Sequence, residues 1–144
     1  MDIPIGSVFI SRNLKEDDNS SPGFWNHVSI YIGDNSIVEA YGEQLGVIQT
    51  SLDEYKQRDY EYFVRYPKNK EIGKRAAIQA VKLIGSPYRY ISSIFRRMRR
   101  DEKGESCVSV IRKAYYRASG YDPKHWKIPD SLAGDTIFLT DILN

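Results

Sequence analysis

Alternating apolar and polar residues dominate the first half of the chain and predict a series of short β-strands. The clearest run is residues 27–33 (HVSIYIG), where the branched apolar residues share one side and the polar and aromatic residues share the other. Residues 34–35 (DN) predict a turn, and residues 36–42 return as the second strand of a hairpin. Further strands are predicted over residues 7–12, 46–50 and 61–67.

Helical patterns dominate the second half of the chain. The Ala-rich residues 70–84 predict a helix that is capped by Gly85, and residues 106–120 predict a second one that closes at its final glycine. A capping-box spacing in residues 51–54 (SLDE) predicts a short helix through about Arg58. The order, strands before two principal helices, favours an α+β fold over a parallel doubly wound one, in which strands and helices alternate.

This fold is expected to be an antiparallel sheet, a meander or barrel-like, packed against the two principal helices. The 144 residues suit a single domain spanning residues 1–144, and the 41% hydrophobic and 28% charged residues are typical of a soluble globular chain. Twenty-one Lys and Arg against 19 Asp and Glu leave a net charge of +2, so the charge does not favour nucleic acid as a partner.

The first residues lack the pattern of a signal peptide, and no apolar run approaches the roughly 20 residues that span a bilayer. We therefore expect a cytoplasmic protein without integral membrane contact. One cysteine and two histidines are fewer ligands than a zinc site usually draws on, so we expect no metal and no cofactor.

The single cysteine, Cys107, lies one residue inside the predicted second helix, directly after Ser106 as the N-cap. Free N–H groups and the partial positive charge of a first helical turn stabilise a thiolate. The spacing of Cys107 to Ile111 and Ala114 also places it on an apolar stripe, as is typical of a buried core cysteine. By position alone, core packing is the commoner of these two roles.

The hairpin brings a carboxylate toward His27. If paired positions sum to 68, the apolar residues share one face and Ser29 faces Glu39, which then lies diagonal to His27 within side-chain reach. A sum of 66 would place Glu39 directly opposite His27, and an odd sum would set Glu39 against Ile30. The even registers allow Glu39 to orient the imidazole, as a nucleophile–base–orienter triad requires, whereas a lone surface histidine is the simpler alternative.

Three segments together resemble a known group of enzymes: WNHVSIYIGDNSIVEAYGEQLGV, GSPYRY and ESCVSVIRKAYYRASG. They resemble the circularly permuted papain-like hydrolases of the NlpC-type superfamily, which include a branch related to lecithin:retinol acyltransferase. In that group the histidine strand comes first, a third polar residue follows on the next strand, and a cysteine at a helix N-terminus comes last. The resemblance covers residues 7–121 and implies a permuted papain-like fold with cysteine hydrolase activity.

The resemblance also implies roles for individual residues. Cys107 would be the nucleophile, His27 the general base and Glu39 the orienting residue, a position at which some relatives carry histidine. Tyr88 matches a tyrosine that lies near the oxyanion site in relatives, although it could equally be a core aromatic. The backbone N–H of Cys107 is the other natural oxyanion donor. Trp25 and Tyr41 would wall a substrate cleft or, alternatively, pack in a half-exposed sheet.

Three alternatives stay open at this point. Cleavage of an amide in a small-molecule, amino-acid or peptide-type substrate through a thioester is favoured, because the acyltransferase branch is typically membrane-associated; an acyltransferase or lipid-ester hydrolase is the alternative. His125 is a second candidate base, but no carboxylate lies at strand spacing from it. A non-catalytic binding module would use the basic cluster at residues 96–100, which is more simply a solvated face balanced by nearby acidic residues.

Overall fold

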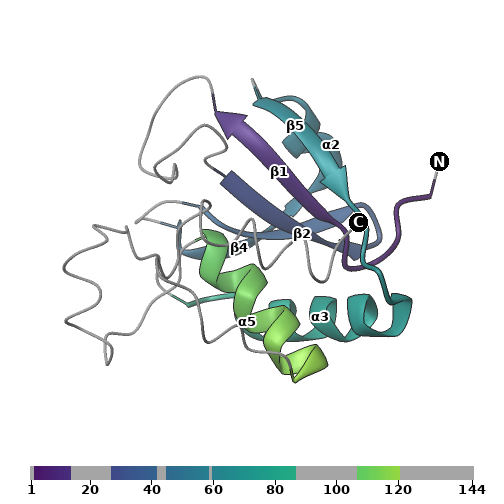
Figure 1. The fold of residues 1–144 in the computed structure, drawn as a ribbon. Coiled ribbons are helices and arrows are strands. Elements are labelled where there is room, and N and C mark those ends of the chain that lie inside the picture. The colour runs from purple at the N-terminus through teal and green to yellow at the C-terminus, as the bar shows by residue number, and fades with distance from the viewer. Residues whose placement is uncertain (1, 14–26, 42–44, 59, 87–106, 121–144) are drawn as a thin grey trace.

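The computed structural model describes residues 2–13, 27–41, 45–58, 60–86 and 107–120, and the statements below concern these residues. Their strands form one antiparallel sheet of five strands in the order β4-β3-β2-β1-β5 (Figure 1). The strands are β1 (Val8–Asn13), β2 (His27–Gly33), β3 (Ser36–Ala40), β4 (Val47–Ser51) and β5 (Tyr60–Arg65). The helices are α2 (Leu52–Lys56), α3 (Lys70–Lys82) and α5 (Cys107–Ser119). The α+β fold with an antiparallel sheet and two principal helices is confirmed.

The β2–β3 hairpin has one of the two even registers that the sequence pattern allows. Ile30 pairs with Val38 and Tyr31 with Ile37, so the paired positions sum to 68. Asp34 and Asn35 form the turn with φ angles of 49° and 57°. Two successive residues with positive φ suit the right-handed twist of a hairpin, and Asp and Asn tolerate this backbone conformation better than most residues. A two-residue turn at these positions pairs Gly33 with Ser36, whose positions sum to 69, and a register shift between Tyr31 and Gly33 restores the sum of 68 that the apolar pattern favours.

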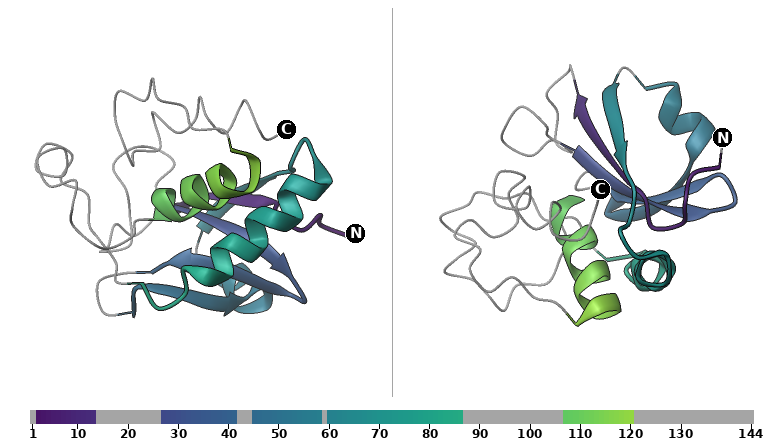
Figure 2. Two further views of the ribbon diagram at one scale, coloured as in Figure 1. Left: turned by 90° about the horizontal axis from the view of Figure 1, so that it is seen from below. Right: turned by 45° about the vertical axis from the view of Figure 1, so that its right-hand side comes forward.

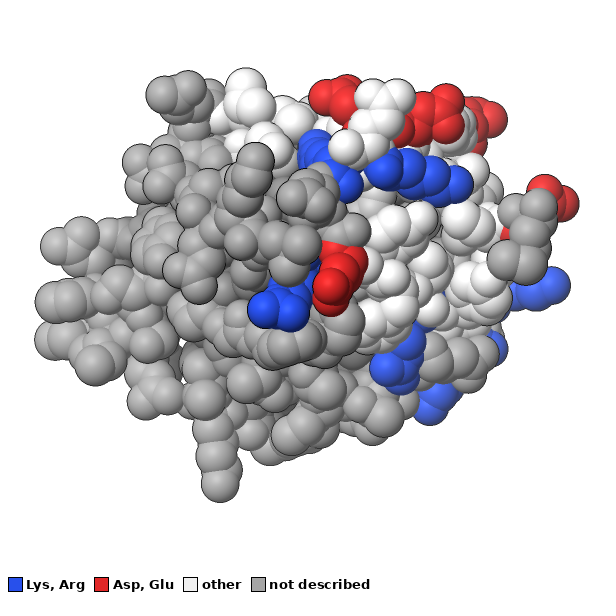
Figure 3. All heavy atoms as spheres, turned by 90° about the horizontal axis from the view of Figure 1, so that it is seen from above, with Lys and Arg blue, Asp and Glu red and all other residues white. Residues whose placement is uncertain are grey.

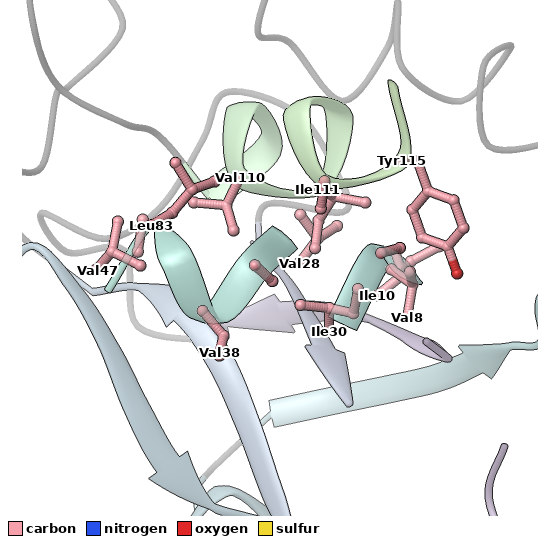
Figure 4. Packing of buried hydrophobic residues seen from close by; sticks show 14 residues of the cluster. Val8, Ile10, Val28, Ile30, Val38, Val47, Leu83, Val110, Ile111 and Tyr115 are labelled. Carbon is pink, nitrogen blue, oxygen red and sulfur yellow. The ribbon is translucent and has the colours of Figure 1, made fainter. Parts of the chain in front are cut away.

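Two apolar layers cover the two faces of the sheet. On one face α3 and α5 pack together and against the strands, around Val28 and Ile30 of β2 and Val110 and Ile111 of α5 (Figure 4). On the other face, Leu52 and Tyr55 of α2 pack with buried residues of β1 and β3. Figure 2 shows the two principal helices lying side by side on their face of the sheet. Because side chains alternate along a strand, β1, β2, β3 and β5 supply residues to both layers.

The position of α5 is fixed at two points along its length. Val110, Ile111 and Ala114 are buried against the sheet and α3. Nearer the end of the helix, the hydroxyl of Tyr115 donates a hydrogen bond to the backbone carbonyl of Gly6. Packing and hydrogen bond together hold α5 in one orientation, and this orientation decides where its first residue lies.

Several predicted boundaries were wrong by one to two residues. The helix predicted over residues 70–84 ends at Lys82, with Leu83 as its C-cap in place of Gly85. Gly85 lies two residues further on with φ 94°, and its N–H donates to the carbonyl of Val47 at 2.9 Å, which ties the helix exit to β4. The strand predicted over residues 61–67 is Tyr60–Arg65, and the one predicted over 36–42 ends at Ala40. The predicted helix start is confirmed: Ser51 is the N-cap of α2, and its hydroxyl oxygen accepts a hydrogen bond from the Glu54 N–H at 3.1 Å.

The meander does not extend to the last strand. β1 to β4 follow one another across the sheet, but β5 pairs with β1 at the opposite edge from β4. The chain between β4 and β5 contains helix α2, which lies on one face of the sheet. Its buried Leu52 and Tyr55 pack against that face. The chain that leaves α2, including Arg58, consequently runs across the face that carries His27 and Glu39.

Candidate active site

His27 and Glu39 are joined by a buried hydrogen bond. Nε2 of His27 lies 2.8 Å from Oε1 of Glu39, and both side chains are 0% exposed. His27 is the first residue of β2, and its side chain lies on the face opposite Val28 because side chains alternate along a strand. In the observed register Glu39 is diagonal to His27, and the side chains span that offset.

Glu39 accepts hydrogen bonds at both carboxylate oxygens. Oε1 accepts from His27 and from Nη1 of Arg58 at 2.7 Å, and Oε2 accepts from Nη2 of Arg58 at 2.7 Å. The hydroxyl of Thr50 donates to Oε2 at 2.6 Å. The contact with Arg58 is therefore bidentate, the geometry in which a guanidinium binds a carboxylate most strongly. Four donors from three parts of the chain hold this carboxylate in one orientation.

These contacts determine the ionisation of Glu39. Burial alone would raise the pKa of its carboxyl group, but the hydrogen bonds and positive charges of His27 and Arg58 outweigh burial and lower the pKa from 4.5 to about 2. At neutral pH Glu39 is thus ionised and can only accept hydrogen bonds. It follows that Nε2 of His27 carries a proton directed at Glu39, and that a neutral His27 accepts protons at Nδ1.

Two tyrosines surround the Arg58 guanidinium. Its central carbon lies 4.3 Å from the ring centre of Tyr41 and 5.5 Å from that of Tyr55. Tyr41 also meets the imidazole of His27 edge-on, with ring centres 6.3 Å apart. Tyr41 is half-buried. The structure therefore brings Tyr41, one of the two predicted cleft residues, into contact with both His27 and Arg58.

Cys107 is the first residue of α5, one residue after the predicted start. In all three views of Figures 1 and 2, the amino-terminal end of α5 lies at the end of the sheet where β2 begins. Since β2 begins at His27, the predicted nucleophile and the predicted base belong to element ends that lie together. The N–H groups of the first turn of α5 are directed away from the helix at this end.

Other predicted site residues lie outside the described residues. They are Trp25, Tyr88, the basic cluster at residues 96–100, and His125, together with the predicted N-cap Ser106. Their predicted roles stay predictions. In the described ranges, no group of three or more His, Cys, Asp and Glu side chains is placed to hold a metal ion.

The sequence analysis did not find Arg58 or Thr50. Thr50 of β4 pairs with Ile37 of β3, so it lies on the same face as Glu39 and diagonal to it. The register between β3 and β4 was not predicted. Arg58 follows α2, and no periodicity marks it. The signal that could have found it is physical: a carboxylate on a strand of buried residues needs a cationic partner.

The surface of the described residues carries charges of both signs. On the face seen from above Figure 1, Lys and Arg side chains are interspersed with Asp and Glu side chains, and uncharged surface lies between them (Figure 3). One exposed ion pair joins β1 and β5: Arg12 Nη1 lies 3.9 Å from Glu61 Oε2. Among the helices that the structure describes, none has the length and apolar character needed to cross a membrane.

A comparison with protein families assigns the chain. The family model of permuted papain-like amidase enzymes, YaeF/YiiX, C92 family, matches residues 4–132. The chain belongs to this family. No curated protein and no solved structure matched the chain. Membership in this amidase family agrees with the observed fold, an antiparallel sheet covered by helices with the histidine strand before the cysteine helix. The expected permuted papain-like fold is thereby confirmed.

Proposed function

We propose that this member of the permuted papain-like amidase family is a cysteine hydrolase with a Cys107–His27–Glu39 triad. Its substrate would be the amide of a small amino-acid or peptide-type molecule. The proposal includes the finer relationship to the NlpC-type superfamily, which the three sequence segments suggest. The observation that carries it is the buried 2.8 Å contact between His27 Nε2 and Glu39 Oε1 at the start of β2.

The first half of the reaction forms a thioester. Nδ1 of His27 takes the thiol proton of Cys107, which leaves a thiolate and an imidazolium whose Nε2–H bonds to ionised Glu39. The sulfur attacks the amide carbonyl, and the carbonyl π electrons move to oxygen. When the tetrahedral intermediate collapses, the C–N bond breaks, and Nδ1 gives its proton to the departing amine. The products of this half are a free amine and an acyl group on Cys107.

The second half releases the acid. A water molecule attacks the thioester carbonyl while Nδ1 of His27 takes one of its protons. Collapse of this second intermediate breaks the C–S bond, releases the carboxylic acid and returns the thiolate–imidazolium pair. Glu39 keeps its negative charge throughout, because its low pKa prevents it from taking the proton of His27 at neutral pH.

Stabilisation of the oxyanion falls to groups near Cys107. The backbone N–H of Cys107 belongs to the first turn of α5, where N–H groups have no partner within the helix and the helix dipole is positive. The hydroxyl of Tyr88 is the proposed second donor. Tyr41, which contacts His27 edge-on, and Trp25 are proposed to bound the substrate cleft.

The test is a substrate screen with two readouts. Wild type, Cys107→Ala and His27→Ala are incubated with aminoacyl and dipeptidyl p-nitroanilides, and released p-nitroaniline is followed by absorbance. Intact mass spectrometry of rapidly quenched samples detects an acyl adduct. We expect cleavage and an adduct only in wild type, because both depend on the thiolate. Cleavage that persists in Cys107→Ala would contradict the proposal.

The same screen separates hydrolysis from acyl transfer. With an added primary amine or alcohol, a hydrolase partitions its acyl group mainly to water, whereas an acyltransferase yields mainly the new amide or ester. We expect the free acid as the main product. Predominant transfer would assign the acyltransferase alternative.

A further inference from the structure

We propose that Arg58 is a positioning residue of the active site, one that fixes the charge and orientation of Glu39 and through Glu39 fixes which nitrogen of His27 exchanges protons. This inference rests on the proposed function for its catalytic consequence, but its structural part is testable without catalysis. No sequence motif marks Arg58, and it touches neither His27 Nε2 nor the predicted nucleophile in any contact described above. Its effect would be transmitted through Glu39.

The geometry gives Arg58 control of both carboxylate oxygens. Nη1 and Nη2 each donate at 2.7 Å, one to Oε1 and the other to Oε2. A bidentate pair of this kind fixes the plane of the carboxylate as well as its position. In this orientation Oε1 lies 2.8 Å from His27 Nε2 and Oε2 lies 2.6 Å from Thr50 Oγ1. Removing the guanidinium removes two of the four hydrogen bonds and the constraint on rotation.

The charge of Arg58 matters because Glu39 is completely buried. A carboxylate that loses its cation in such a place takes up a proton at a higher pH. The charged and titratable groups that face Glu39 are His27 from β2, Arg58 after α2, and Tyr55 of α2, whose own pKa is raised mainly by burial and also by Glu39. Of these, only Arg58 is positively charged at every pH at which the enzyme would work.

Protonation of Glu39 would change the role of His27. A neutral carboxyl group can donate a hydrogen bond, so it no longer requires the proton of His27 to sit on Nε2. A neutral Glu39 also no longer stabilises the imidazolium. By keeping Glu39 ionised, Arg58 therefore keeps the proton of neutral His27 on Nε2. This leaves Nδ1 as the nitrogen that exchanges protons and favours the charged form of the His27 ring.

Arg58 is itself held in place. Its side chain is 14% exposed, and its guanidinium lies over the Tyr41 ring at 4.3 Å and near the Tyr55 ring at 5.5 Å. Stacking on aromatic rings suits a planar guanidinium and suits a lysine ammonium less well, and lysine lacks the two parallel donors. A lysine at this position would keep the positive charge and lose the two parallel N–H donors. Arg58→Lys therefore separates the contribution of the charge from that of the bidentate hydrogen bonds.

The direct test is nitrogen NMR of the histidine side chains. The chain has two histidines, so spectra that correlate ring nitrogens with carbon-bound protons contain two imidazole patterns, and His125→Gln assigns them. Wild type, Arg58→Ala and Arg58→Lys are titrated from pH 2 to 8. Arg75→Ala is the matched control, because Arg75 is an exposed arginine of α3 and its loss changes the net charge equally.

We expect the Nε2–H form of neutral His27 in wild type and in Arg75→Ala. In Arg58→Ala, the titration step of Glu39 moves up by about 1–3 pH units and appears in the His27 resonances. Arg58→Lys lies between the two, because it retains the charge. His27 spectra and titrations that are the same in Arg58→Ala as in Arg75→Ala would overturn the proposal. If Arg58→Ala does not fold, Arg58→Lys carries the test. A titration of Arg58→Lys that is the same as that of wild type would overturn the role of the bidentate hydrogen bonds.

The catalytic consequence is read from the pH dependence of Cys107 alkylation in the same variants. In Arg58→Ala, protonation of Glu39 removes the support of the imidazolium, so the acid limb of the profile moves to higher pH, and Arg58→Lys restores part of the shift. An acid limb unchanged from that of Arg75→Ala would contradict this step. Failure of the proposed function is distinguishable, because it would show as slow labelling in the wild type itself whatever the His27 spectra report.

Discussion

Nε2 of His27 lies 2.8 Å from Oε1 of Glu39, although the hairpin register places the two residues diagonally and not face to face. The diagonal offset leaves room on the same face for Arg58 and Thr50, which bind the same carboxylate. The observed arrangement joins four side chains, and the predictions below depend on this network.

Replacing Glu39 by glutamine should strongly reduce hydrolysis. The amide has nearly the shape of the carboxylate but no charge, and its NH₂ group faces a guanidinium N–H of Arg58 whichever way the amide is turned. We expect kcat/KM for the p-nitroanilide substrate to fall by about 10²–10⁴-fold, the range typical of general acid–base catalysis. Glu61→Gln is the control, because Glu61 is a surface carboxylate whose side chain is 60% exposed, and it should behave as wild type. Equal activity of the two variants would mean that Glu39 has no part in catalysis.

The low pKa of Glu39 predicts a specific loss of stability in acid. The folded state holds the group at a pKa of about 2 against an ordinary value of 4.5, so the unfolded chain binds the proton first on acidification. The contribution of Glu39 to the free energy of unfolding is therefore complete above about pH 4.5 and decreases as the pH falls toward 2. The difference of 2.5 pH units between these two values corresponds to a contribution of about 3 kcal/mol to the free energy of unfolding.

Urea denaturation followed by circular dichroism between pH 2 and 6 measures this dependence. Glu39→Gln should be less stable than wild type at pH 6, since Arg58 then loses its anion, and its stability should change less between pH 4.5 and 2. Glu61→Gln should keep the wild-type slope. An equally steep slope in Glu39→Gln would show that other carboxylates account for the acid sensitivity.

Gly73→Ala should destabilise the fold, contrary to helix propensity. In the interior of α3, alanine is normally favoured over glycine by up to about 1 kcal/mol. A Cβ at Gly73, however, would lie 2.7 Å from the backbone carbonyl oxygen of Ile5 and 2.7 Å from the Pro67 ring. Backbone at that distance has to shift, at a cost of about 1–3 kcal/mol.

Thermal or urea unfolding of Gly73→Ala tests this close approach, with Lys74→Ala as the control. Lys74 is exposed on the same helix, and its 3.7 Å ion pair with Glu71 is a surface pair that contributes little. We expect a change within about 0.5 kcal/mol for Lys74→Ala. A gain in stability for Gly73→Ala would mean that α3 and residues 5–6 are not in close contact.

The sequence predicted the parts of this site that follow from local patterns. The alternation in the two strands was enough to limit the hairpin to two even registers and, from either of them, to predict the approach of Glu39 to His27, but the register shift between Tyr31 and Gly33 was not predicted. Helix α5 was predicted to within one residue from its apolar stripe and from Gly120, which has the expected positive φ of 74°.

The rest depends on contacts between residues far apart in the chain. The pairing of β5 with β1 follows from the path of α2 across the sheet, and nothing in residues 60–65 specifies which edge they join. Arg58 reaches Glu39 only because of that path. Sequence patterns mark faces and ends of elements, whereas a bidentate contact between a strand and a loop 19 residues later is a property of the assembled fold.

The central claim, that Cys107 is a nucleophile activated by His27, is tested most directly by the pH dependence of alkylation. Because Cys107 is the only cysteine, iodoacetamide adducts read by intact mass report on it alone. Wild type should be labelled rapidly at pH 6, His27→Ala should be labelled slowly at the same pH, and Glu61→Gln should match wild type. Labelling of wild type that occurs only after unfolding in denaturant would show that Cys107 is a core residue, and would contradict the assignment of this chain as a working cysteine hydrolase.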